Sequence, residues 1–230
     1  GFPKRSESEY DVFDTGHAGN SISVALGLAV ARDRKKSKGT IAAVIGDGSL
    51  TSGMSYEALN QAGHLGTKLI IILNDNEMSI AKNVGAMSSY LSRIRLEPAY
   101  NKLRDEVEER IKKVPGIGEL LFSLGDHIKE SIKAFVVPAG MLFEEMGLTY
   151  IGPIDGHDIQ QVAANIVLAK AIKGPVLLHV LTRKGYGYAP AEDFPDKFHG
   201  VAPYSVDTGE TISKAKVPSY TEVFGEALLE

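Results

Sequence analysis

The sequence contains no cysteine, no long hydrophobic run and no stripe of basic residues. The lack of cysteine excludes disulfides and thiolate metal sites, and it fits a reducing compartment. No apolar run is long enough to span a membrane and no signal peptide is visible, so we expect a cytoplasmic protein without a membrane partner. The formal net charge of −4 argues against a nucleic-acid partner.

The residues that are present have the composition of a globular chain. Of the 230 residues, 43% are hydrophobic and 23% are charged, which is enough to bury a sizeable core in one large or two small domains. Short apolar runs at 41–45 and 68–73 are typical of parallel strands that are buried on both faces. Between them, a helix of about three turns is predicted from Thr51 or Ser52 to a stop near Gly66. The sequence therefore predicts an α/β fold.

Polar motifs follow both of these strands. Gly46-Asp47-Gly48 follows the first and Asn74-Asp75-Asn76 follows the second. Since a strand-helix-strand crossover sets the strands parallel, we expect Asp47 and Asn76 at one edge of the sheet, where α/β proteins bind ligands. A carboxylate and an amide oxygen suit Mg²⁺, and Gly46 and Gly48 allow a sharp turn close to an anion. Either motif alone is more typical of a surface turn, but together they favour a ligand site.

These two motifs resemble the thiamine diphosphate signature of the transketolase-like enzymes. More specifically, the stretches IGDGSLTSGMSYEALNQAG and LNDNEMSI are similar to the 1-deoxy-D-xylulose-5-phosphate synthase family. The similarity runs from residues 1–5 through 198–199 to 219–220. The resemblance implies a transketolase-like first domain, which is a mostly parallel sheet with helices on both faces.

The resemblance also implies the residues of the site. Mg²⁺ would be bound by Asp47, Asn76 and the backbone carbonyl of Met78, and His199 matches an active-site histidine that would be catalytic. On sequence alone His199 is a loop histidine, and His17 is equally well an ordinary residue before the apolar helix at 22–31. The glycines around His17 place backbone amides at the start of this helix, where an anion is stabilised. The residues implied to contact thiamine diphosphate are Gly16, His17, Ala18, Gly48, Ser49, Asn76 and Tyr188.

The reaction implied by the resemblance joins pyruvate to D-glyceraldehyde 3-phosphate with loss of carbon dioxide. The product, 1-deoxy-D-xylulose 5-phosphate, opens the non-mevalonate route to isoprenoids and also feeds thiamine and pyridoxal biosynthesis. A homodimer is implied for the full-length enzyme. Two alternatives remain at this point: half of another transketolase-type enzyme, or a cofactor-binding module without catalysis.

The rest of the chain predicts further elements around this centre. The helix at 22–31 is expected to be buried on most sides, and a helical insertion is expected at about 88–137. A helix at 138–147, a strand at 148–151, a helix capped by Asp158 and a strand at 175–182 follow.

The predicted domain limits follow from composition and from the ends of the chain. We expect a diphosphate- and Mg-binding domain over 1–202, a linker over 203–218 and the start of a second, pyrimidine-binding domain at 219–230. The chain begins at Gly1 without Met and stops within a helical pattern, so we interpret it as a fragment. Compared with the synthases it resembles, it would lack an N-terminal portion and most of two further domains. We therefore expect no turnover from the chain by itself.

Overall fold

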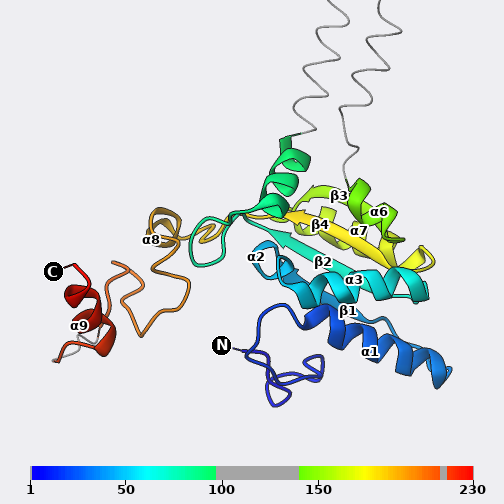
Figure 1. Ribbon diagram of the computed structural model, residues 1–230, viewed down its shortest axis with the longest axis horizontal. Helices are drawn as coiled ribbons and strands as arrows, with labels where there is room; N and C mark the ends of the chain where they lie inside the picture. Colours follow the sequence, from blue (N-terminus) through cyan, green and yellow to red (C-terminus); the bar gives the residue numbers. More distant parts are fainter. Residues whose placement is uncertain (1, 97–139, 213–216, 230) are drawn as a thin grey trace, which may run out of the picture. The chain divides into compact units, whose positions relative to one another are not determined.

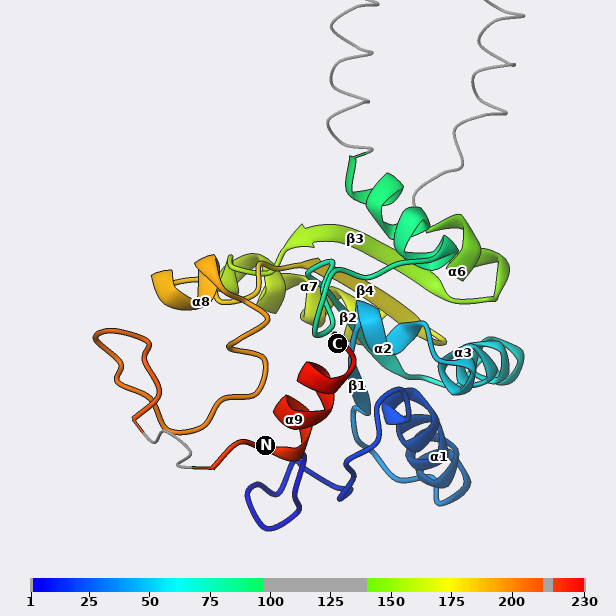
Figure 2. The same cartoon turned by 60° about the vertical axis from the view of Figure 1, so that its left-hand side comes forward.

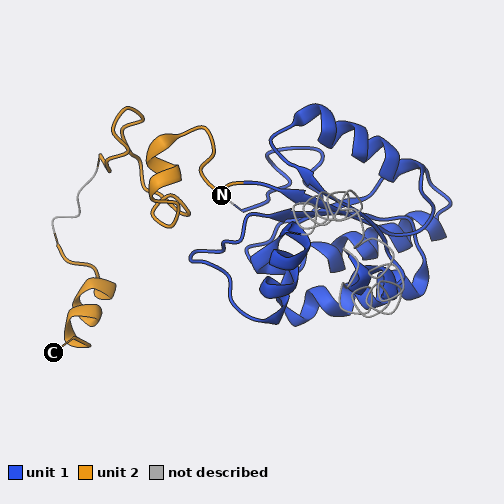
Figure 3. Cartoon of the chain, turned by 90° about the horizontal axis from the view of Figure 1, so that it is seen from above, with its two compact units in different colours: residues 1–182 blue, residues 183–230 orange. Residues whose placement is uncertain are grey.

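The computed structural model describes residues 2–96, 140–212 and 217–229 (Figure 1). Contacts within the chain divide it into two units, Gly1–Thr182 and Arg183–Glu230, and each unit is described by itself (Figure 3). Most of the helical insertion expected at 88–137 lies outside the described residues. Of that insertion, only its beginning is seen, as part of a helical stretch at 86–96.

The first unit contains a sheet of four parallel strands in the order β1-β2-β4-β3 (Figure 1). Gly46 pairs with Asn74, so the residues that follow β1 and β2 lie at the same edge of the sheet. This arrangement confirms the predicted parallel sheet, and it is favoured because the apolar strands are buried on both faces. The strands are β1 (Ala42–Gly46), β2 (Ile70–Asp75), β3 (Thr149–Asp155) and β4 (Val176–Leu181).

Helices cover both faces of the sheet, as predicted (Figure 2). On one face α1, α3, α6 and the helical residues 86–96 share a core with Ile71 and Leu177. On the other face α7 packs through Ala169 against Ile70 and Val176. In the described part of the chain, no helix has both the length and the apolar character needed to cross a membrane. The bounds are α1 (Ser21–Arg34), α3 (Gly53–Leu65), α6 (Met141–Glu145) and α7 (Ile159–Ala171).

Local capping explains where two of these helices begin and end. Ser52 is the N-cap residue of α3, and Gly66 ends that helix in the left-handed conformation with φ of 59°. At α7, the Asp158 side chain accepts a hydrogen bond from the backbone amide of Gln161 at 3.0 Å, as an N-cap residue does. The sequence predicted both features correctly.

Two local expectations are wrong. The helix α1 is buried along one side only, and Gly27 is exposed, because α1 packs mainly against α3 and the edge strand β1. The Gly-Asp-Gly motif is not a turn. Gly46 is extended with φ of −78° and ψ of 153°, and Asp47–Leu50 form a one-turn helix, α2, which the buried side chain of Leu50 anchors in the core.

Within its described residues, the second unit contains two short helices, α8 (Ala189–Asp193) and α9 (Tyr220–Ala227). The rings of Tyr188, Phe198 and Tyr204 form a cluster with centroids 5.2–6.1 Å apart. The Tyr188 hydroxyl donates to the backbone carbonyl of Val206 at 2.7 Å. The first part of the predicted linker is therefore a loop that folds onto Tyr188, while the predicted domain limits stay a prediction.

Candidate functional site

Two aspartates lie at the edge of the sheet where β1 and β2 end. Asp47 is the first residue of α2 and Asp75 is the last residue of β2, and their exposed fractions are 4% and 1%. Asp47 Oδ2 accepts a hydrogen bond from the Asn83 side-chain amide at 2.8 Å. Its other oxygen, Oδ1, is buried and has no hydrogen-bond partner among the described residues. An ionised carboxylate in this position is therefore incompletely satisfied.

Electrostatics at Asp47 match this geometry. Burial raises the pKa of Asp47 to about 6, and the neighbouring charge of Asp75 acts in the same direction. The backbone amides of Gly48 and Asn76 lower the pKa by a smaller amount. A positive charge at Oδ1 would favour the ionised form, so Asp47 has the properties expected of a cation ligand.

Asp75 has the opposite environment. Its Oδ2 lies 2.9 Å from His179 Nε2, and its Oδ1 accepts from the Arg95 guanidinium at 2.7 Å. Burial alone would raise the pKa of Asp75, but the hydrogen bond from His179 and the charge of Arg95 bring it below the ordinary value. Asp75 is thus a buried anion whose partners are supplied by the protein itself.

The loop after β2 is held in place by short-range hydrogen bonds. Asp75 Oδ1 accepts from the Glu77 amide at 3.2 Å, and Asn76 Oδ1 accepts from the Met78 amide at 3.0 Å. The backbone amide of Asn83 closes the loop by donating to the Glu77 carbonyl at 3.0 Å. A carbonyl oxygen has two lone pairs, so Asn76 Oδ1 can bind a cation while it keeps this bond.

This loop packs directly on Gly48. A Cβ atom at Gly48 would lie 2.9 Å from Ser79 Cβ and 3.1 Å from Asn83 Oδ1. Glycine is therefore required here by the close approach of the loop, which gives a physical reason for the second glycine of the motif. At Gly46 nothing lies within 4 Å of the corresponding position.

A second segment of the predicted site precedes α1. Gly16, His17 and Ala18 are exposed and line a groove of about 570 Å³ beside β1, together with Ser49. This volume lies within the usual range of about 300–1,000 Å³ for small-molecule sites. The structure therefore brings these four predicted residues to one groove.

The first turn of α3 joins this segment to α2. The buried hydroxyl of Ser55 lies 3.0 Å from the Gly19 carbonyl and 3.2 Å from the Ser49 carbonyl, and it can donate to either. Gly19 has φ of 80°, and a Cβ atom there would lie 2.1 Å from Ser52 Oγ. The conformation and the close contact both require glycine at this position.

The donor set determines which metal could bind. The described residues contain no group of three or more His, Asp or Glu side chains that could hold a metal. Asp47 Oδ1, Asn76 Oδ1 and the Met78 carbonyl offer oxygen only, which suits Mg²⁺ with phosphate oxygens completing its shell. The buried Oδ1 of Asp47, which has no hydrogen-bond partner among the described residues, fits such an ion.

Tyr188 and His199 belong to the second unit. His199 is exposed, and its Nδ1 lies 3.0 Å from Lys184 Nζ. Loss of hydration raises the pKa of Tyr188, and Tyr204 and Asp207 raise it further. Because the two units are described separately, the position of Tyr188 and His199 relative to Asp47 stays a prediction.

Sequence reasoning missed Ser55, Asn83 and His179, which support the site without belonging to its motifs. His179 lies in the apolar run of β4, and Ser55 lies on the buried side of α3. A signal was present, since a polar residue within a buried run must find a hydrogen-bond partner. The identity of that partner depends on the sheet order, which no local pattern gives.

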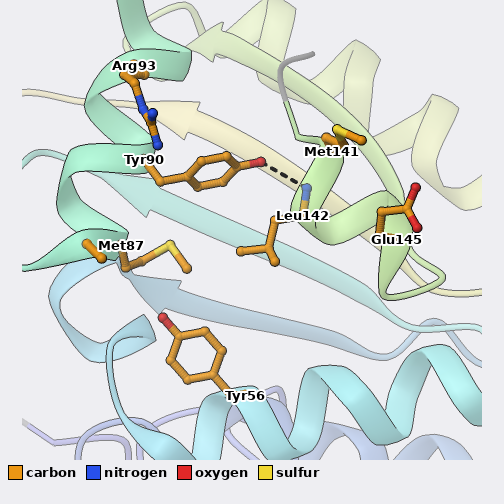
Figure 4. Close-up of a pocket in the computed structure, with 8 residues that line it drawn as sticks. Tyr56, Met87, Tyr90, Arg93, Met141, Leu142 and Glu145 are labelled. Atoms are coloured by element: carbon orange, nitrogen blue, oxygen red, sulfur yellow. Dashed lines mark hydrogen bonds between the residues drawn. The ribbon is translucent and has the colours of Figure 1, made fainter. Parts of the chain in front are cut away.

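A separate hollow of about 500 Å³ lies over α3, α6 and helical residues 86–96 (Figure 4). The backbone amide of Leu142 donates to the Tyr90 hydroxyl at 3.1 Å and so joins two of its walls. None of the predicted site residues lines this hollow. Its lining residues are Tyr56, Ala86, Met87, Tyr90, Arg93, Met141, Leu142 and Glu145.

Comparisons with known proteins agree with this fold. A solved transketolase from Campylobacter jejuni shares the fold with a TM-score of 0.52, at 22% identity over 80% of this chain and 23% of that chain. Two curated relatives described as 1-deoxy-D-xylulose-5-phosphate synthase are 54% identical (Pelotomaculum thermopropionicum) and 58% identical (Desulforudis audaxviator) over the whole of this chain. The chain spans 36% of the length of each. The family model for 1-deoxy-D-xylulose-5-phosphate synthase matches residues 1–182, and the chain therefore belongs to this family.

Proposed function

We propose that this chain provides the diphosphate- and Mg²⁺-binding part of an enzyme that makes 1-deoxy-D-xylulose 5-phosphate from pyruvate and D-glyceraldehyde 3-phosphate. The observation that carries the proposal is the buried, unpaired Oδ1 of Asp47 beside Asn76, in a chain of this family. Thiamine diphosphate, when bound, supplies the chemistry that cleaves the carboxylate from pyruvate and joins the two substrates.

Different residues of the chain would bind the metal ion and compensate the charge of the diphosphate. Asp47, Asn76 and the Met78 carbonyl would hold Mg²⁺, which would supply positive charge for the diphosphate. With a net charge of −4 and no stripe of basic residues in its sequence, the chain is expected to compensate the diphosphate charge locally through the ion and backbone amides. Gly48 lets the loop of residues 77–83 close over this point.

The remaining predicted residues orient the cofactor and substrates. Gly16, His17, Ala18 and Ser49 line the groove and contact the cofactor in this proposal. In the same proposal Tyr188 also contacts the cofactor, and His199 accepts or donates a proton or binds substrate. The isoprenoid, thiamine and pyridoxal roles, the cytoplasmic location and the homodimer belong to the same proposal, as do the domain limits 1–202, 203–218 and 219–230.

Calorimetry with thiamine diphosphate tests the proposal. We would titrate the chain, and a chimera in which it replaces the matched region of the Desulforudis audaxviator relative, with and without Mg²⁺. We expect binding that depends on Mg²⁺, and Asp47→Ala should weaken it by about 100-fold, as loss of an essential ligand does. The matched control is Asp155→Ala, since Asp155 likewise lies at the carboxyl end of a parallel strand but is exposed.

Two outcomes would contradict the proposal. One is binding of thiamine diphosphate to the parent chimera with equal affinity in the presence and absence of Mg²⁺. The other is unchanged Mg²⁺-dependent binding by Asp47→Ala. Activity of the chimera on pyruvate and D-glyceraldehyde 3-phosphate, lost in Asp47→Ala and kept in Asp155→Ala, would then connect the site to the reaction.

A further inference from the structure

His179 lies in the apolar run of β4 and is fully buried. No part of the proposed function uses it. Its two ring nitrogens nevertheless both have partners, since Nε2 lies 2.9 Å from Asp75 Oδ2 and Nδ1 lies 2.8 Å from the Tyr150 hydroxyl. A neutral ring with its proton on Nε2 satisfies both contacts, because it donates to Asp75 and accepts from Tyr150.

We propose that His179 is a positioning residue for the cation site. From β4 it fixes the carboxylate of Asp75, and Asp75 fixes the loop that presents Asn76 and Met78. His179 itself contacts neither the cation nor the cofactor in this scheme. The inference rests on the proposed function, because it concerns the same cation.

The packing around His179 keeps the ring in one place. The neighbouring strand β3 approaches so closely that a Cβ atom at Gly152 would lie 3.1 Å from His179 Cβ and 2.6 Å from the His179 carbonyl oxygen. The ring of Tyr150 meets that of His179 edge-on with centroids 6.0 Å apart. A residue packed this closely, with both ring nitrogens bonded, offers its hydrogen bond to Asp75 in a fixed direction.

Asp75 passes this constraint to the loop because its other contacts lead there. Asp75 Oδ1 accepts from the Glu77 amide at 3.2 Å and from Arg95 at 2.7 Å. Its backbone carbonyl accepts from the Thr182 amide at 2.9 Å and from Arg95 at 3.2 Å. Without His179, Oδ2 would lose this hydrogen bond in a buried position, and the carboxylate could rotate away from Glu77 to seek another donor. That rotation would release the turn in which Asn76 and Met78 are held.

Substitutions at His179 separate this role from simple packing. The amide nitrogen of glutamine reaches the place of Nε2, whereas the amide of asparagine reaches only the place of Nδ1. We expect His179→Gln to keep the affinity for the cation, and His179→Asn and His179→Leu to lose about 10–100-fold, the usual range for residues that orient a metal ligand. The probe is Mn²⁺, titrated in the presence of thiamine diphosphate and followed by its electron paramagnetic resonance signal.

Thr67→Val is the matched control. Thr67 is also buried, and its hydroxyl donates to Asp33, outside the site residues. We expect this variant to lower the melting temperature by an amount comparable to that of His179→Asn while leaving Mn²⁺ affinity unchanged. Such a result would show that the loss at His179 does not come from lower stability of the fold.

Three other results would contradict the inference. If His179→Leu or His179→Asn folds and binds Mn²⁺ as the parent does, the positioning role is wrong although the proposed function stands. If His179→Gln loses as much affinity as His179→Asn, the donor at Nε2 is not the cause and the inference is overturned. If the parent chimera does not bind Mn²⁺ with thiamine diphosphate, the inference and the proposed function both fail.

Discussion

Asp47 follows β1 directly and Asp75 ends the neighbouring parallel strand β2, and both side chains are almost fully buried. The protein nevertheless surrounds their carboxylates in opposite ways. Asp75 is hydrogen-bonded to His179 at Oδ2 and to Arg95 at Oδ1, and its pKa lies below the ordinary value. Asp47 accepts a hydrogen bond from Asn83 at Oδ2, whereas its Oδ1 has no hydrogen-bond partner among the described residues. The pKa of Asp47 is raised to about 6.

The difference shows how a fold separates support from function at one edge of a sheet. A buried carboxylate that the protein neutralises internally strengthens the local structure, because its partners come from other strands and helices. A buried carboxylate that the protein leaves partly unpaired destabilises the chain without ligand and is available to an incoming cation. Asp75 is the carboxylate that the protein neutralises internally, and Asp47 is the one that is available to a cation.

Removing the internally paired aspartate should have the largest effect. Asp75→Ala leaves His179 and Arg95 without their anion, and we expect a loss of about 3–5 kcal/mol in the free energy of unfolding, as when one member of a buried ion pair is deleted. Denaturant unfolding followed by circular dichroism measures it. A loss below that of the exposed control Asp155→Ala would contradict the role assigned to Asp75.

Removing the charge of Asp47 should instead increase the free energy of unfolding in the absence of Mg²⁺. Since the pKa of Asp47 is raised from 3.8 to about 6, the native state binds more protons than the unfolded state between these values. Stability from this group is therefore fully present below pH 3.8 and is lost as the pH rises to about 6, at about 1.4 kcal/mol per unit of pKa shift. We expect Asp47→Asn to be more stable than the parent at pH 7 by about 2–3 kcal/mol without Mg²⁺.

The pH dependence distinguishes the two aspartates directly. The lowered pKa of Asp75 contributes stability that is present above pH 3.8 and is lost only as the pH falls below it. Unfolding curves of the parent, of Asp47→Asn and of Asp75→Asn between pH 3 and pH 8 separate the two windows. The Asp47 assignment would be wrong if Asp47→Asn showed the same change between pH 4 and pH 6 as the parent.

The sequence was sufficient to place Asp47 and Asn76 at one edge of the sheet, because a crossover between parallel strands allows little else. It was also sufficient for the ends of α3 and α7, where Ser52, Gly66 and Asp158 act within a few residues. Contacts that cross the fold could not be predicted. The pairing of Asp75 with His179 requires that β4 lie beside β2, and this order is a property of the whole sheet.

The same limit applies to the glycine motif. Its sequence suggested a sharp turn, whereas Gly46 is extended and Gly48 is needed because residues 79 and 83 pack on it. The two glycines therefore differ in a way that only the loop of residues 77–83 reveals.

Substitution of these two glycines should show this difference as a change in stability. The change expected at Gly48 is smaller than for the aspartates and larger than for Asn83. Gly48→Ala places a methyl group 2.9 Å from Ser79 Cβ, so the loop must move, and we expect a loss of about 2 kcal/mol from overpacking. Gly46→Ala meets nothing within 4 Å and should change stability by less than about 0.5 kcal/mol. Thermal unfolding of both variants checks this, and equal losses would show that Gly48 is not closely packed.

The smallest expected effect concerns Asn83, which is the internal hydrogen-bond donor of Asp47. Asn83→Ala should cost about 1 kcal/mol at pH 7, where Asp47 is ionised, and less at pH 5, where a neutral carboxyl needs the donor less. Equal losses at both pH values would mean that Asn83 acts through loop closure over Gly48 and not through the charge of Asp47. A loss that grows with pH and disappears on addition of Mg²⁺ would show that the cation and Asn83 compensate the same buried charge.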